Sequence, residues 1–351
     1  MHAMITRRSW AVAGLTAAAT LLLVPGPAHA DRSPGSGSQG NADSGGGREG
    51  QDIVSVIRFS GATRGGGDSG GGGALKPVGD WSPPACWYEP RTAEQFRDQV
   101  ERNYESTVNF PGQHSYAKAA VAQFRSKYKD GEYKNYNLKE KDEGNWWVAV
   151  RDPDRWLEDA AQKCDKEPFW VENGDPPPVA NALTPELLAE LAYNRLRLPD
   201  TKVSLAPEDT TKVNLPTWAW LDEAEFKPVS VTASVDVPGL DLRATTTARP
   251  DALRLAPGTP DARTHPASGE CAPHGDGSIG TPYRKGRSDE TPPCGLTYLR
   301  SSGKGTFKLQ ATITWKVSWT GTGNAGPNGL PSGSFGSDQP VAVEEVQSVN
   351  R

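Results

Sequence analysis

Apolar and polar side chains alternate without interruption between residues 307 and 319. The apolar positions are Phe307, Leu309, Ala311, Ile313, Trp315, Val317 and Trp319, and every residue between them is polar. Successive side chains of a β-strand point to opposite faces, so this pattern predicts a strand with one buried face and one solvated face. Such strands are typical of antiparallel sheets, because both faces of a parallel sheet are covered.

Other segments of the C-terminal half share this period of two. They are residues 229–237, residues 240–244 and a last short strand at residues 341–343. The pair Pro238-Gly239 stands between the first two segments and indicates a tight turn. Short strands with turn signals and no helices between them predict an antiparallel, immunoglobulin-like β-sandwich over residues 201–351.

Residues 79–200 show mainly the period of helices. Thr92 is a candidate N-cap for a first helix, and Asp152-Pro153 and Thr184-Pro185 are typical starts of a third and a fourth. Residues 146–150 predict a strand between the second and third helices. The apolar faces of the four helices are Phe96, Val100, Tyr104 and Val108; Tyr116, Ala120, Phe124 and Tyr128; Trp156, Leu157, Ala160, Ala161 and Cys164; and Leu187, Leu188, Leu191 and Ala192.

The first thirty residues combine the three parts of a secretory signal peptide. Arg7 and Arg8 precede an apolar run over residues 10–24, and Ala28-His29-Ala30 supplies small residues for cleavage. We expect cleavage between Ala30 and Asp31, by the general secretory route rather than the twin-arginine route. The apolar run is too short for an ordinary membrane span. The predicted mature protein is therefore secreted, with no membrane anchor.

Residues 31–78 are rich in glycine and serine and predict a flexible arm. One apolar island, residues 53–59, is a candidate strand that could add to the edge of a sheet. The alternative is an apolar island within a disordered arm. The predicted fold class is therefore α+β: a signal peptide (1–30), the arm (31–78), a mainly helical module with a few strands (79–200) and the sandwich (201–351).

Four cysteines remain after the signal peptide, and an even number in an exported chain indicates two disulfides. Three pairings are possible. We favour Cys86 with Cys164 and Cys271 with Cys294, because each bond closes within one half of the chain. The spacing of Cys271 and His274 would also suit zinc, but a disulfide is the preferred use of that sulfur in this compartment. We expect no metal and no cofactor.

The formal net charge of -5 is small and is distributed along the chain. It predicts no large basic surface, so nucleic acid is not an expected partner. An enzyme that cleaves glycosides needs only two carboxylates across a cleft. The candidates near tryptophans are Glu143, Asp152 and Asp154, with a second group at Asp222, Glu223 and Glu225. Solvated surface charge is the commoner role of such residues.

Aromatic residues suggest a binding function more directly. Tyr133 and Tyr136 lie within a lysine-rich segment that Trp146 and Trp147 adjoin, and exposed aromatic faces beside polar groups suit sugar rings. Trp146 and Trp147 must point to opposite faces of a strand, so at most one of them is expected to reach a ligand.

Several stretches resemble a family of secreted actinobacterial proteins of unknown function. They are Pro84-Ala85-Cys86-Trp87-Tyr88-Glu89-Pro90, Gly144-Asn145-Trp146-Trp147-Val148, Pro168-Phe169-Trp170-Val171, Val213-Asn214-Leu215-Pro216-Thr217-Trp218 and Cys294-Gly295-Leu296-Thr297-Tyr298. The resemblance covers most of the chain beyond the arm. It implies export but supplies no catalytic residues.

The first functional hypothesis is an exported, non-catalytic binding protein of the cell envelope or the extracellular space. Its partner would be a cell-wall glycan or an envelope protein. The second hypothesis is an extracellular hydrolase of polysaccharide or peptidoglycan that uses paired carboxylates. The third is a structural or assembly factor that pairs with a partner through the candidate strand at residues 53–59.

Overall fold

The computed structural model describes residues 55–61, 73–198, 202–221 and 227–345. The predicted signal peptide and its cleavage position lie outside the described residues, as do residues 53 and 54 of the candidate strand. Within the described residues the chain is mostly strand, with few helices, and the sheets are antiparallel apart from one short parallel pairing. These features fit the α+β class.

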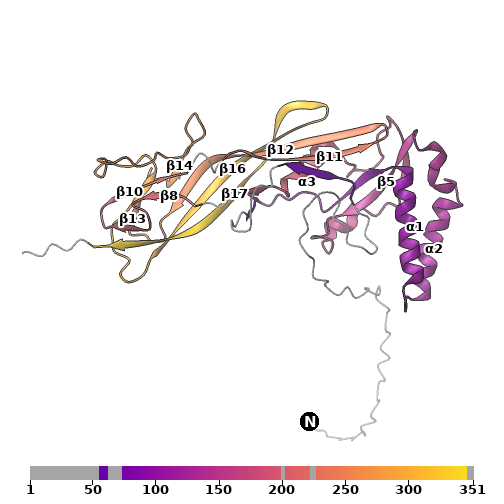
Figure 1. Ribbon diagram of the computed structural model, residues 1–351, viewed down its shortest axis with the longest axis horizontal. Coiled ribbons are helices and arrows are strands. Elements are labelled where there is room, and N and C mark those ends of the chain that lie inside the picture. The colour runs from indigo at the N-terminus through magenta and orange to yellow at the C-terminus, as the bar shows by residue number, and fades with distance from the viewer. Residues whose placement is uncertain (1–54, 62–72, 199–201, 222–226, 346–351) are drawn as a thin grey trace, which may run out of the picture. The chain divides into compact units, whose positions relative to one another are not determined.

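Eight strands form the largest sheet, in the order β1-β11-β12-β16-β17-β3, with β14 beside β12 and β9 beside β17. Its three longest strands run side by side (Figure 1). The bounds are β1 (Arg58–Gly61), β3 (Lys76–Pro77), β9 (Thr210–Lys212), β11 (Val229–Val237), β12 (Leu240–Ala256), β14 (Glu270–Cys271), β16 (Phe307–Gly321) and β17 (Asn324–Glu344).

The alternation at residues 307–319 is confirmed as strand β16. Its apolar side chains from Leu309 to Trp319 are buried, and the residues between them are exposed or half-buried. Helix α3 (Pro185–Tyr193) packs on the sheet, and the buried Thr246 hydroxyl of β12 donates a hydrogen bond of 2.8 Å to Ala189 O of this helix. The predicted N-cap is confirmed, since the Thr184 side chain accepts a hydrogen bond from Leu187 N.

The predicted turn is also confirmed, because Pro238 and Gly239 join β11 to β12. Gly239 has a φ of +78°, which a residue with a side chain rarely adopts. The strand predicted at residues 341–343 is the end of the much longer β17. Pro327, Pro331 and Pro340 lie within β17.

A four-stranded antiparallel sheet lies in the same half of the chain. It contains, in order, β13 (Ala262–His265), β15 (Gly295–Tyr298), β10 (Pro216–Trp220) and β8 (Ser204–Ala206). Tyr298 of this sheet stacks on Phe307 of β16, with ring centroids 5.2 Å apart. β2 (Gly73–Ala74) and β7 (Arg197–Leu198) form a separate two-stranded antiparallel sheet. The immunoglobulin-like arrangement of the two larger sheets stays a prediction.

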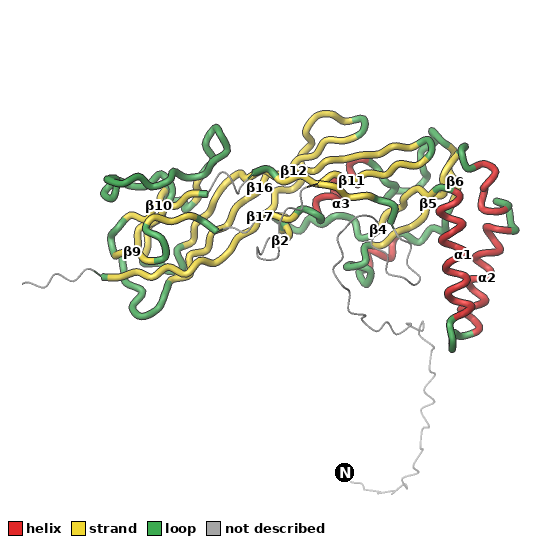
Figure 2. The backbone as a smooth tube through the Cα atoms, viewed as in Figure 1, coloured by secondary structure: helices red, strands yellow, loops and turns green. Residues whose placement is uncertain are grey.

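The N-terminal half contains a three-stranded antiparallel sheet and two long helices that pack side by side (Figure 2). The elements are β4 (Cys86–Arg91), α1 (Ala93–Asn109), α2 (Ser115–Lys129), the 3-10 turns η1 (Asn135–Glu140) and η2 (Asp159–Lys163), β5 (Gly144–Arg151) and β6 (Phe169–Glu172). Thr92 and Gln95 form a capping box at the start of α1. No helix of the described residues is long and apolar enough to cross a membrane.

Two helix predictions need correction. The apolar face of α2 is buried only towards its end, because Tyr116 and Ala120 are exposed. The third helix is wrong: the segment after Asp152 forms turns, and only η2 follows. The Asp152 carboxylate accepts a hydrogen bond of 3.0 Å from Asp154 N, which favours a turn over a helix. Trp156 and Leu157 are consequently exposed.

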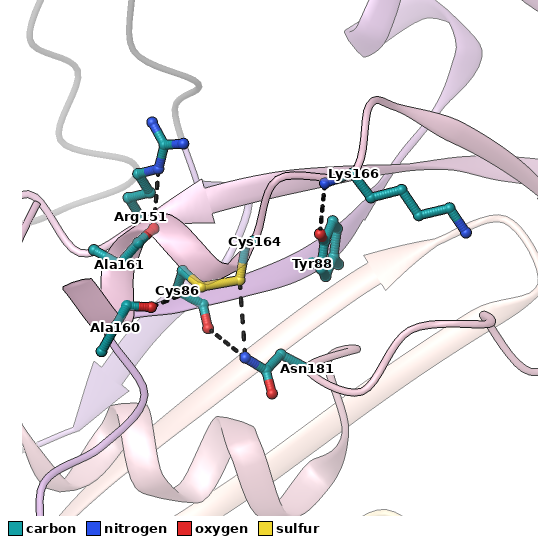
Figure 3. Close-up of a disulfide and its surroundings, with 8 residues drawn as sticks. All are labelled: Cys86, Tyr88, Arg151, Ala160, Ala161, Cys164, Lys166 and Asn181. Carbon is teal, nitrogen blue, oxygen red and sulfur yellow. Dashed lines mark hydrogen bonds between the residues drawn. A yellow bond between two sulfur atoms is a disulfide. The ribbon is translucent and has the colours of Figure 1, made fainter.

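Both predicted disulfides are confirmed. Cys86 bonds to Cys164, and Cys271 bonds to Cys294. Figure 3 shows the first bond, where Asn181 Nδ2 donates a hydrogen bond of 3.4 Å to Cys86 O and lies 3.8 Å from Cys164 Sγ. This disulfide ties the chain after η2 to the first strand of the small sheet.

Candidate functional site

An open hollow of about 670 Å³ lies along the second half of α2. We call it the α2 site. Its lining residues are Ala120, Gln123, Phe124, Ser126, Lys127, Asp130, Gly131 and Glu167. Seven of them belong to α2 or to the two residues after it, where positions three or four apart share a face of the helix. The half-buried Phe124 supplies the aromatic part of the lining, and most of the other side chains are polar.

Glu167 comes from a different segment, and the fold fixes the chain on both sides of it. Lys166 N donates a hydrogen bond of 3.0 Å to the Tyr88 hydroxyl, as Figure 3 shows. Pro168 O accepts one of 3.0 Å from the hydroxyl of Tyr128. The disulfide at Cys164 lies three residues before Glu167. The disulfide and these two bonds therefore hold Glu167 beside α2.

The charged groups of the α2 site are two carboxylates and one ammonium. Lys127 forms an ion pair with Glu167 across the hollow. Asp130 accepts a hydrogen bond of 3.3 Å from Ser126 Oγ. All three charged side chains are exposed, so each can exchange its present partner for a ligand at small cost.

A strained turn follows the α2 site in the chain. Lys134, Asn135, Tyr136 and Asn137 have φ values of 30°, 55°, 60° and 58°. The left-handed conformation costs roughly 1–2 kcal/mol for each residue with a side chain. Such strain persists only where surrounding contacts impose it, and it often marks functional segments. The turn buries Tyr136 and Asn137 and leaves the side chains of Lys134 and Asn135 in solvent.

Buried hydrogen bonds hold this turn in place. Trp146 Nε1 donates one of 2.9 Å to Tyr136 O, and the Tyr136 hydroxyl donates one of 2.8 Å to Glu101. Glu101 also accepts hydrogen bonds from Arg125 and Lys129. The bond from Arg125 is the largest cause that lowers the pKa of Glu101 to about 2, and burial opposes it. The carboxylate is therefore charged at neutral pH and anchors both the turn and α2.

The predicted aromatic ligand residues are placed mainly in the core. Trp146 is 0% exposed, and Trp147 and Tyr136 are also buried. The expectation that one of the two tryptophans lies in the core is therefore confirmed, whereas the expectation of an exposed face is wrong for the other tryptophan and for Tyr136. Trp146 is surrounded by other rings, with the Phe96 centroid 4.5 Å away and the Tyr133 centroid 4.7 Å away. Tyr133 is half-buried and is the only one of the four that keeps substantial exposure. These aromatic side chains pack against the strained turn and do not form an exposed surface on which a sugar ring could stack.

Among the described candidate carboxylates, Glu143 lies far from Asp152 and Asp154, which are neighbours in one turn where Asp154 is exposed. Glu143 lies just before β5, and Asp152 and Asp154 lie just after it. Nine steps of extended chain separate Glu143 from Asp152 by roughly 30 Å, far beyond the spacing of a glycosidase pair. Asp222, Glu223 and Glu225 lie outside the described residues. No group of three or more metal-ligating side chains occurs in the part of the chain that the structure describes.

The residues of the α2 site were not found from the sequence. The helical spacing predicts a buried position for Phe124, and no local pattern connects Asp130 with Glu167. A weak signal for the strained turn does exist, because asparagine is enriched in left-handed conformations and stands at positions 135 and 137. Comparisons with protein-family models, with curated proteins and with solved structures find no match.

Proposed function

We propose that this protein is an exported, non-catalytic binding protein that recognises a glycan of the cell envelope through the α2 site. The observation that carries this proposal is the lining of the hollow. Phe124 offers an apolar face for a sugar ring, and amide, hydroxyl and charged groups from Gln123, Ser126 and Asp130 surround it. Sugars require this combination, because their ring faces are apolar and their edges carry hydroxyls.

The size and openness of the hollow support a glycan over a small cofactor. Sites for small molecules typically measure about 300–1,000 Å³ and enclose most of their ligand. The volume of the α2 site falls within this range, but the site is open to solvent. An open site suits a segment of a glycan chain that continues beyond the site on both sides. Two disulfides are typical of proteins that work outside the cytosol, where such glycans occur. The predicted export and the resemblance to secreted actinobacterial proteins belong to the same proposal.

A hydrolase is the alternative, and Asp130 with Glu167 is the carboxylate pair that it would use. A glycosidase needs one acid whose pKa is raised by an apolar setting. Both carboxylates here are exposed, and Glu167 is paired with Lys127. This setting favours binding over catalysis.

The test is retention of the mature protein by purified cell wall, followed by calorimetry with the soluble glycan fragments released from it. Phe124→Ala should weaken binding about tenfold, which corresponds to roughly 1.4 kcal/mol of lost stacking. Tyr116→Ala is the matched control, because Tyr116 is an exposed aromatic residue of the same helix that does not line the hollow. Equal affinity of the two variants would contradict the assignment of the site, and no retention of the unaltered protein would contradict the function. Release of new reducing ends that stops in Glu167→Gln would favour the hydrolase.

A further inference from the structure

Residues 55–61 of the arm contact Glu89 of β4 and pair with the edge of β11. Glu89 is 0% exposed. One carboxylate oxygen accepts a hydrogen bond of 2.8 Å from Ser55 Oγ, and the other accepts one of 2.8 Å from Val56 N. Glu89 is thus a buried charge for which the arm supplies two of its hydrogen-bond donors.

The remaining donors of Glu89 come from its own strand. Trp87 Nε1 donates a hydrogen bond of 3.1 Å and Arg91 Nη2 one of 2.6 Å. Residues 87, 89 and 91 alternate along β4 and therefore share one face. Two donors of Glu89 therefore come from β4 and do not depend on the arm.

The rest of the segment is held as an edge strand. Ile57 is buried, and the ring of Phe59 lies under the guanidinium of Arg195, with 5.0 Å to the ring centroid. Residues 58–61 then pair antiparallel with residues 231–234 of β11. Backbone pairing gives affinity and side-chain pockets give specificity, as in other sites that accept an added strand.

We propose that this strand is transferable, and that the site formed by Glu89 and the edge of β11 also accepts residues 55–61 from a second copy of this chain. The hydrogen bonds and buried contacts are the same in either case, so the two forms differ mainly in the cost of association. Exchange of an identical element is a low-cost route to dimers for that reason. β1 itself spans only four residues, and three of them are exposed.

The chain's own arm competes with any strand that arrives from outside. A short tether gives an effective concentration on the order of millimolar, so the unaltered protein should be monomeric at micromolar concentration. Damage to the arm removes this competition. Ile57→Asp is the suitable change, because it places a charge at a buried position of the arm and leaves Glu89 and β11 unaltered.

The experiment measures binding of a labelled synthetic peptide of residues 55–61 by fluorescence anisotropy. We expect the Ile57→Asp chain to bind the peptide at least tenfold more tightly than the unaltered chain does. A peptide with Ser55→Ala should lose about tenfold, in line with a hydrogen bond to a charged group. A scrambled peptide is the control. Absence of binding to a folded Ile57→Asp chain would overturn the proposal, and if that chain does not fold, Phe59→Ala replaces it.

Mixing two full-length variants tests whether a second copy of the chain occupies the site. One carries Ile57→Asp and keeps an intact site, and the other carries Glu89→Gln and keeps an intact arm. Light scattering should report monomers for each chain alone and a one-to-one complex for the mixture. If the peptide binds but the mixed chains stay monomeric, the site accepts a strand and the second copy is not its occupant.

Discussion

Removal of the disulfide between Cys86 and Cys164 should destabilise the protein more than removal of the one between Cys271 and Cys294. The first closes a loop of 78 residues and the second a loop of 23. If a disulfide acts by restricting the unfolded chain, these loops correspond to about 4.5 and about 3.4 kcal/mol. All four cysteines are buried, so the cost of the cavities left by alanine is similar and largely cancels in the difference.

The measurement is urea unfolding of the two double alanine variants, followed by tryptophan fluorescence. The free energies of unfolding are compared at a common m-value, because a change in m would report a change in the surface exposed on unfolding. The variant without Cys86 and Cys164 should lose about 1 kcal/mol more than the other. An equal or reversed order would refute the reasoning from loop length. The same variant should also bind glycan more weakly, because Glu167 follows Cys164 closely, whereas the other should bind as before.

Three further predictions concern the strained turn and its support. Asn135→Val should lower the free energy of unfolding by roughly 1–2 kcal/mol, because a β-branched residue adopts a φ of 55° only with strain. Asn135→Gly should leave the free energy of unfolding unchanged or raise it, because glycine adopts this φ freely; thermal unfolding compares the two variants. Glu101→Gln should destabilise the protein at pH 7. Folding lowers the pKa of Glu101 from 4.5 to about 2, so the ionised carboxylate stabilises the protein above pH 4.5, and this stabilisation disappears as the pH falls towards 2. The difference in free energy of unfolding between the variant and the unaltered protein, measured in urea, should therefore shrink over that range. A constant difference would contradict the assignment. Trp146→Ala should cost about 3–5 kcal/mol, and a loss below 1 kcal/mol would show that its ring cluster is not a tightly packed core.

The elements that could be predicted are those whose cause is local. β16 follows from side-chain alternation, and the start of α3 follows from Thr184 and Pro185, because caps act within a few residues. The third predicted helix failed for the opposite reason. Its apolar spacing was helical, but the Asp152 side chain and the disulfide at Cys164 impose turns that spacing does not describe.

The longer strand pairings and the α2 site could not be predicted, because segments far apart in the sequence form them. Residues 324–340 of β17 contain several glycines and prolines, and they are held as a strand by their register with β16. Glu167 joins Lys127 only after the sheet, the disulfide and Tyr128 have placed the segment around it. The aromatic cluster was noticed from the sequence, but its burial depends on the packing of α1 and α2 over β5.

The two edges of the large sheet differ in what they can offer to another polypeptide. On one side, β3 and β9 pair with only two and three residues of β17, and Pro327, Pro331 and Pro340 of β17 have no N–H group to donate. On the other side, β11 contains no proline and is covered by four residues of the arm. Strand addition is therefore expected at the β11 edge when the arm leaves it, rather than along β17.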